Sequence, residues 1–245
     1  TRSLIPNVVP YSADAPLADL DRWLHGGVDP WTLLYRDDGA PILGVGLSDD
    51  LYIALWSTLA ITFPVLLAVV DSSAVRRRRY LILFLFCWIV LGQLLATAVA
   101  SVGPVFYDRL VGGDRFAGLV AAHAAAGFPE SGFGQTQNFL WQGYVENIAI
   151  GSGMSAFPSV HVAVAMLFAL YLAERSIWLL PLGVAFVGAT LVISVTSGYH
   201  YAVDGYASIL LVAGAWAALL VRARAARGWP SPAIGIEAAS ARQGD

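Results

Sequence analysis

The chain has 245 residues, of which 58% are hydrophobic and 13% are charged, whereas ordinary soluble domains carry about 25% charged residues. Its apolar residues gather into several long runs without internal charge, which is typical of membrane spans. This composition excludes an ordinary water-soluble globule. The net charge of -3 is too small to indicate a polyanionic partner, so we expect no nucleic-acid partner.

The basic residues and the single cysteine restrict the chemistry further. All 14 basic residues are arginines, so a reaction that needs an amine nucleophile or a phosphate-binding lysine is excluded. Cys87 lies within an apolar run, where we interpret it as a buried thiol. No positive and apolar leader follows Thr1, and we expect the native chain to begin further upstream.

The N-terminal segment, residues 1–50, precedes the long apolar runs. Within it, residues 17–35 mix Leu and Trp with Asp and Arg. This pattern suits a short amphipathic helix lying in the membrane interface. It suits an ordinary surface helix packed on the domain equally well.

Five apolar runs follow, most of them near the ~20 residues that cross ~30 Å of hydrocarbon. They are residues 51–70, 80–102, 156–173, 177–197 and 203–221. We therefore predict an all-α fold, a polytopic transmembrane helical bundle with five spans in this sequence. A sixth span upstream would return the N-terminus to the cytoplasm, so we expect six spans in the native chain.

Arginines beside the runs predict the orientation. They are residues 76–79, Arg175, Arg222, Arg224 and Arg227. The positive-inside rule places them on the cytoplasmic side. Alternation then places residues 1–50, 103–155 and 198–202 on the extracytoplasmic side, which in a bacterium is the periplasm or the exterior.

The connection formed by residues 103–155 is rich in glycine and too long for a plain linker. We predict that it folds over the extracytoplasmic face as a helical cap, with a helix at residues 136–150. Residues 51–227 then form the transmembrane catalytic core, which includes this cap. The Pro-, Ser-, Ala- and Gly-rich residues 228–245 are expected to be a disordered cytoplasmic tail.

His200 and Asp204 stand one helical turn apart at the start of the last apolar run. Ionisable groups at a membrane boundary are costly, so they are candidates for function. Residues i and i+4 share a helix face, so the Asp204 carboxylate can accept a hydrogen bond from one imidazole nitrogen of His200. The other nitrogen then stays basic, which is the arrangement of an activated nucleophilic histidine.

A second motif, with Pro158, Ser159 and His161, opens the third run. Proline close to a helix start is a start signal, and the first helical turn exposes amides that bind phosphate. The topology places His161 on the same membrane face as His200. We therefore expect two histidines and a carboxylate beside an anion site.

Other interpretations of these residues remain open. A lone buried histidine is most often a hydrogen-bonded core residue, but the spacing of His200 and Asp204 favours a functional site. Two histidines and one aspartate can also bind a metal ion, although zinc sites usually draw on closer spacings. We expect neither a metal nor another cofactor.

The motif Pro158-Ser159-Val160-His161, followed by His200-Tyr201-Ala202-Val203-Asp204, resembles the second and third signatures of the type 2 phosphatidic acid phosphatase superfamily, P-S-G-H and S-R-x5-H-x3-D. The resemblance covers about residues 51–221. It implies a six-helix membrane core that removes or transfers phosphate on lipids through a phosphohistidine. By this resemblance His200 is the nucleophile, Asp204 orients it, and His161 protonates the leaving alkoxide.

Two cationic parts of the family pattern are missing. The first motif, K-x6-R-P, needs a lysine, and Ser194 stands where the third motif has its arginine. This loss resembles the inositol phosphorylceramide synthase-like branch, in which an alcohol can accept the phosphoryl group. Arg109 is the first candidate for a replacement phosphate clamp and Arg115 the second, although each is equally well explained as a headgroup-level anchor.

Further contacts to the substrate are expected from Ser159, Gly198 and Tyr201, which stand beside the two histidines in the sequence. His123, within the cap, is interpreted as structural. His25 receives no role.

The leading hypothesis is a lipid phosphatase or phosphotransferase in a bacterial plasma membrane, acting at the extracytoplasmic face on a phospholipid or polyprenyl phosphate. Its expected partners are the bilayer, the lipid phosphate and an alcohol acceptor such as inositol. A vanadate-dependent haloperoxidase shares the chemistry, but those enzymes resemble soluble helical proteins. The alternative from another class is a transporter or lipid-binding protein whose His and Asp form a proton relay.

Overall fold

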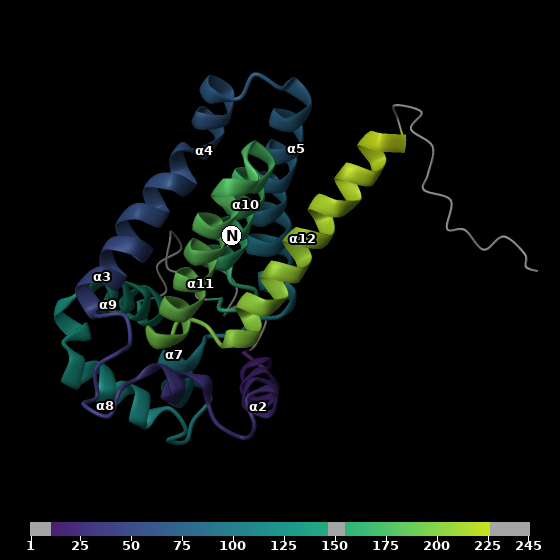
Figure 1. Cartoon of the computed structure of the whole chain (residues 1–245). Coiled ribbons are helices and arrows are strands. Elements are labelled where there is room, and N and C mark those ends of the chain that lie inside the picture. Colours follow the sequence, from purple (N-terminus) through teal and green to yellow (C-terminus); the bar gives the residue numbers. More distant parts are fainter. Residues whose placement is uncertain (1–10, 147–154, 226–245) are drawn as a thin grey trace, which may run out of the picture.

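The computed structural model describes residues 11–146 and 155–225, and every regular element in these two stretches is a helix (Figure 1). The helices before residue 100 are α2 (Asp14–Leu24), η2 (Pro30–Leu34), α3 (Val45–Ser48), η3 (Asp49–Leu55), α4 (Trp56–Val70), α5 (Ala74–Leu85), η4 (Phe86–Leu95) and α6 (Ala96–Ala98). The later helices are α7 (Pro104–Leu110), α8 (Ala117–Ala126), η5 (Phe128–Glu130), α9 (Gly132–Val145), α10 (Val160–Arg175), η6 (Ile177–Leu179), α11 (Leu180–Thr196) and α12 (Ala202–Ala225).

Four continuous helical stretches are long and apolar enough to cross a membrane. They are Val45–Val70, Ala74–Ala98, Ile177–Thr196 and Ala202–Ala225. On their outer faces large apolar side chains such as Ile61, Val69 and Leu210 are 76%, 79% and 73% exposed, as expected of a surface that contacts lipid. The predicted all-α polytopic bundle is therefore confirmed.

Four of the five predicted runs form helices long and apolar enough to cross a membrane, and the third forms a shorter helix. The third predicted run, residues 156–173, forms α10, which has 16 residues and extends about 24 Å at ~1.5 Å per residue. This helix is shorter than the run because residues 155–159 are not helical and lead into the site. Helix α10 lies inside the bundle and contacts α4, α5, η4, α11 and α12 (Figure 1).

Two expected boundaries also shift. The first spanning helix starts at Val45, so the expected boundary at residue 50 falls inside a helix. The helix expected at residues 136–150 is α9, which begins earlier, at Gly132. Residues 147–150 of that expectation, and the tail 228–245, lie outside the described residues.

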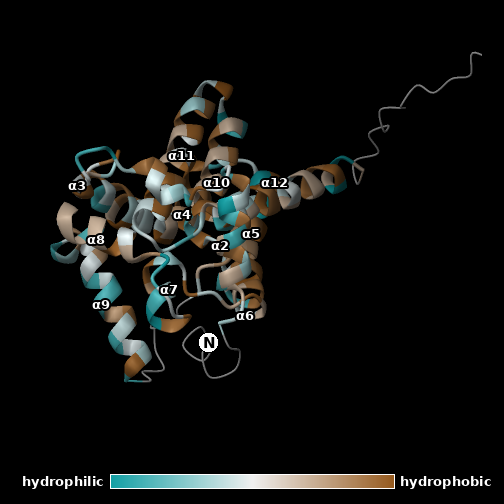
Figure 2. Ribbon diagram, turned by 90° about the horizontal axis from the view of Figure 1, so that it is seen from below, coloured by the Kyte–Doolittle hydropathy of each residue, from teal (hydrophilic) through white to brown (hydrophobic). Residues whose placement is uncertain are grey.

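The two ends of the bundle differ in composition. Helices α2, α7, α8 and α9 gather at one end and form the cap (Figure 1), and Figure 2 views the molecule from this end. The turn between α4 and α5 and the ends of α10 and α12 lie at the opposite end. The cytoplasmic arginines expected from the sequence, as far as they are described, all belong to that opposite end.

Helix α2 packs on the domain through a buried face. Its buried residues are Asp14, Leu17, Ala18 and Asp21, and they lie against the start of α12. Helix α2 therefore packs on the domain, and the interfacial position of residues 17–35 stays a prediction. The opposite face leaves Trp23 74% exposed.

Candidate active site

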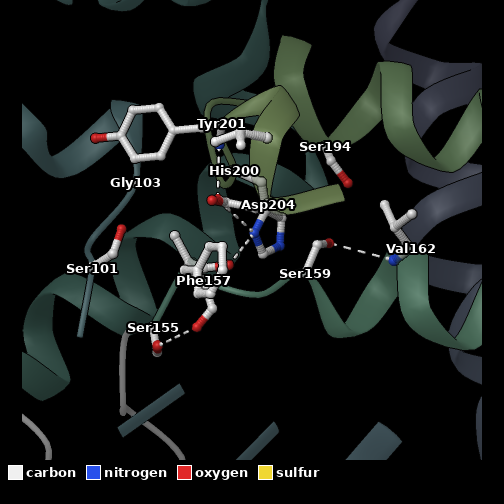
Figure 3. Close-up of polar contacts among 12 residues, drawn as sticks. Ser101, Gly103, Ser155, Phe157, Ser159, Val162, Ser194, His200, Tyr201 and Asp204 are labelled. Carbon is white, nitrogen blue, oxygen red and sulfur yellow. Dashed lines mark hydrogen bonds and ion pairs between the residues drawn. The ribbon is translucent and has the colours of Figure 1, made fainter. Parts of the chain in front are cut away.

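His200 ends the turn between α11 and α12, close to the segment that leads into α10 (Figure 3). Its Nδ1 lies 2.6 Å from the carbonyl oxygen of Ala156. A carbonyl oxygen only accepts hydrogen bonds, so Nδ1 donates and carries the proton. In the neutral ring Nε2 therefore holds the lone pair, and no described residue hydrogen-bonds to it.

Asp204 lies in the first turn of α12 with a fully buried side chain. Its Oδ2 is 3.6 Å from Nδ1 of His200 and accepts a hydrogen bond from the amide of Tyr201 at 2.9 Å. The expected direct hydrogen bond from His200 to the carboxylate is therefore replaced by one to Ala156. The carbonyl fixes the tautomer, and the carboxylate is placed to stabilise an imidazolium charge.

His161 lies beside His200, with 6.1 Å between the ring centroids. Its ring is held between Tyr52 and Trp56, at centroid distances of 4.2 and 4.0 Å. The indole N–H of Trp56 also donates to the backbone carbonyl of His161 at 2.9 Å. The structure therefore brings the three predicted catalytic residues together and restricts the rotation of the His161 ring.

Ser159 caps the N-terminus of α10 beside this pair. Its hydroxyl oxygen accepts a hydrogen bond from the amide of Val162 at 3.4 Å, and its own amide donates to the carbonyl of Asp204 at 3.4 Å (Figure 3). Ser159 is fully buried, so it ties the starts of α10 and α12 to each other. The first turn of α10, with its partial positive charge, consequently lies beside the two histidines.

Comparison with known protein families identifies the family in which this arrangement occurs. The model of the PAP2 superfamily matches residues 15–218. The chain belongs to the PAP2 superfamily. The match confirms the resemblance to the type 2 phosphatidic acid phosphatases and begins inside α2, well before the expected residue 51. No curated protein and no solved structure matches the chain.

Membership supports a phosphatase-type activity on lipid phosphates in a membrane. It does not select the inositol phosphorylceramide synthase-like branch, which remains a prediction. The arrangement differs from the family pattern at the cationic positions, and the structure shows what stands there.

At the position of the family's arginine, Ser194 is fully buried and its hydroxyl lies 3.1 Å from the hydroxyl of Tyr52. Tyr52 thereby links the missing arginine's position to the ring of His161. Sequence reasoning missed Tyr52 and Trp56 because aromatic residues in an apolar run are usually core residues. Their i, i+4 spacing, which places both on one helix face, was the available signal.

The two candidate arginines are engaged elsewhere. Arg115 donates to Asp19 at 2.6 Å and to Asp29 at 3.0 Å, so it holds the N-terminal segment. Arg109 lies 5.1 Å from the ring centroid of Trp141, on α9. In the described residues neither guanidinium contacts the triad, and Arg115 is paired with acidic residues near α2. The phosphate clamp stays a prediction for both arginines.

Gly198 and Tyr201, whose substrate contacts stay a prediction, make close contacts within the protein. Gly198 has φ +70° and accepts a hydrogen bond from the amide of Val105 at 2.9 Å. A Cβ at this position would lie 3.0 Å from the Cβ of Val105, so glycine permits the close turn. The Tyr201 hydroxyl donates to Asp14 at 3.0 Å and its side chain is buried.

His123 has the structural role expected of it. Its Nε2 donates to the carbonyl of Thr196 at 2.7 Å, and its ring stacks on Phe128 at 4.2 Å. Burial lowers the pKa of His123, which keeps the ring neutral. Within the described part of the chain no group of three or more His, Cys, Asp or Glu side chains is arranged to hold a metal ion.

Proposed function

We propose that this PAP2 protein cleaves or transfers the phosphate of a membrane lipid through a phosphohistidine on His200. One observation carries the proposal. The hydrogen bond from Nδ1 to the carbonyl of Ala156 leaves the Nε2 lone pair as the nucleophile, with His161 as its neighbour.

In the first half-reaction Nε2 of His200 attacks phosphorus, a P–N bond forms and the P–O bond to the leaving group breaks. His161 gives its proton to the departing alkoxide. The amides at the start of α10 face the phosphoryl oxygens, and the Asp204 carboxylate, 3.6 Å from Nδ1, stabilises the positive ring.

In the second half-reaction an oxygen nucleophile attacks the phosphohistidine, and the P–N bond breaks. His161 takes the proton of this nucleophile. Water yields inorganic phosphate, whereas an alcohol such as inositol yields a new phosphoester. The missing cationic motifs and Ser194 support transfer to an alcohol, through the resemblance to the synthase-like branch.

We place the reaction at the extracytoplasmic face of a bacterial plasma membrane. The triad lies at the cap end of the bundle, whereas residues 76–79, Arg175, Arg222 and Arg224 belong to the other end. The positive-inside rule supports this orientation.

The central experiment compares the wild type with His200→Ala and His123→Gln on a panel of lipid phosphates and diphosphates in mixed micelles. We expect His200→Ala to lower turnover by roughly 10³-fold or more and to abolish the acid-labile phosphoenzyme. His123→Gln keeps a donor for the Thr196 carbonyl and is expected to retain activity. Orthovanadate is expected to inhibit the wild type.

The same assays separate the remaining alternatives. Phosphate release that falls when inositol or another polyol is added, with a new phospholipid product, identifies transfer. Phosphate release that is unchanged by the added alcohol identifies hydrolysis. If the folded wild type cleaves no lipid phosphate and forms no phosphohistidine, the enzyme proposal is wrong and a transporter or lipid-binding role with a proton relay takes its place.

A further inference from the structure

Helix α2 carries two carboxylates that point into the molecule. Asp14 is fully buried and Asp21 is 3% exposed. They stand seven positions apart, so they lie about two turns apart on one helix face. Asp and Glu side chains are almost never fully buried unless they have specific partners, and these two have partners at the site.

Asp14 collects four donors from two segments that enclose the site. It accepts hydrogen bonds from the Ser101 hydroxyl at 2.9 Å, from the amides of Val102 and Gly103 at 2.9 and 3.0 Å, and from the Tyr201 hydroxyl at 3.0 Å. All these donors are neutral. Among the described residues no cation pairs with Asp14.

These donors connect Asp14 to both contacts that orient His200. On one side, the carbonyl of Ser101 accepts the amide of Ala156 at 2.7 Å, and the carbonyl of Ala156 accepts Nδ1 of His200 at 2.6 Å. On the other side, the amide of Tyr201 donates to Asp204 at 2.9 Å. Asp14 therefore joins the two branches that hold the histidine.

Asp21 fixes the start of α12 from outside that helix. It accepts hydrogen bonds from the amides of Ala202 and Val203 at 3.1 and 3.0 Å, the two residues that directly precede Asp204. A carboxylate bound to the first-turn amides caps a helix and complements its dipole. The only cationisable group facing Asp21 in the described residues is His25, at 3.8 Å.

We propose that Asp14 and Asp21 are positioning residues for the His200–Asp204 pair, and that α2 is therefore a part of the active-site framework. The inference rests on the proposed function of His200. Burial raises the pKa of both carboxyl groups, that of Asp21 to about 6. A buried carboxylate with a raised pKa destabilises the fold when it is ionised. The main contribution of these two groups is therefore to hold the backbone around His200 and Asp204 in place.

The test uses Asp14→Asn and Asp21→Asn in the full chain, with Asp19→Asn as the matched control. Asp19 lies between them on α2, but its side chain is 74% exposed. We expect kcat to fall about 10- to 100-fold in both positioning variants, because small displacements of a reacting group are that costly. KM and the thermal unfolding midpoint are expected to match those of the control.

Two outcomes overturn the proposal. One is a kcat equal to that of Asp19→Asn. The other is a loss of activity that follows a loss of folded protein, which indicates a structural role alone. If Asp14→Asn does not fold, Tyr201→Phe decides for Asp14, because it removes a single hydrogen bond to that carboxylate.

A second readout does not depend on lipid turnover. The rate at which diethyl pyrocarbonate modifies His200 is measured by mass spectrometry, with His123 as the internal reference. We expect the rate at His200 to change about threefold or more in Asp21→Asn and to stay constant in Asp19→Asn. If the wild type proves inactive on lipid phosphates while this rate changes, the proposed function fails but the positioning role stands; an unchanged rate refutes the role.

Discussion

The two ends of this bundle hold their buried carboxylates in different ways. At the cap end, Asp14 and Asp21 accept hydrogen bonds from backbone amides and hydroxyls. At the other end, Asp71 pairs with Arg76, and Glu174 pairs with Arg79. Ion pairs of the second kind compensate the charge of the carboxylate, whereas carboxylates of the first kind are held by neutral donors.

The difference indicates that the two ends have different tasks. Glu174 joins three helices, because the Tyr80 hydroxyl of α5 and the Trp216 indole of α12 also donate to it, at 2.9 and 2.5 Å. This end fastens the spans to one another. At the cap end, buried amides and carboxylates surround His200, the residue of the proposed active site. Burying these carboxylates without a cation lowers the stability of the fold, as is common at functional sites.

Asp204→Asn is expected to give the largest effect at the cap end. The substitution removes the negative charge 3.6 Å from Nδ1 of His200 and leaves the size of the side chain unchanged. We expect kcat to fall roughly 10²- to 10⁴-fold, with no decrease in the thermal unfolding midpoint. A midpoint that falls together with activity would remove the contrast between the two ends.

Glu174→Gln is expected to show the reverse at the other end. It leaves the Arg79 guanidinium without its ion pair and costs about 3 kcal/mol in the free energy of unfolding. Activity per folded molecule is expected to stay within about twofold, because the change is remote from the triad. Denaturant unfolding checks the first value, with the exposed Arg78→Gln as control. A free energy of unfolding equal to that of the control would contradict a stabilising role for Glu174.

The free energy of unfolding is expected to depend on pH through Asp21 at the cap end, in the opposite direction to Asp71 at the other end. Burial raises the pKa of Asp21 from 3.8 to about 6, so the folded state binds the proton more tightly than the unfolded state. Stability therefore decreases as the pH rises through this window, by at most about 3 kcal/mol. Asp21→Asn is expected to flatten the curve between pH 4 and 6. An unchanged slope would show that Asp21 is not the group responsible.

The smallest change in the free energy of unfolding is expected at Asp71, where stability decreases as the pH falls. Its hydrogen bonds to Arg76 lower the pKa of Asp71 from 3.8 to about 2. The stabilisation is therefore present above about pH 4 and is lost as the pH falls toward 2, by about 1 to 2 kcal/mol. Unfolding midpoints of the wild type and Asp71→Asn are expected to converge at low pH. Midpoints that stay equally far apart would contradict this.

Local patterns in the sequence were sufficient to predict the helical membrane bundle and to select three residues that the structure brings together. Hydrophobic runs predict spans because a membrane helix must bury its backbone groups over ~20 residues. The i, i+4 spacing of His200 and Asp204 and the Pro158 helix start each depend on a few neighbouring residues. The length of α10, 16 residues, was not predicted, because its start depends on the non-helical segment that leads into the site.

Partners distant in the sequence could not be predicted. Nothing near Ala156 indicates that its carbonyl binds His200, 44 positions away. The charges of α2 were interpreted as a solvent or interface face, because buried carboxylates are rare. Nothing in the sequence indicated that Arg115 would pair with Asp19 and Asp29.

The sequence by itself determined that this is a membrane protein without lysine, and it predicted a triad of His161, His200 and Asp204. Composition and short-range spacing are sufficient for that, because they reflect the solvent and the helix period. The tertiary structure alone decided what holds the triad: the Ala156 carbonyl, the rings of Tyr52 and Trp56, and the arrangement of α2. Those contacts join segments far apart in the chain, and only packing brings such segments together.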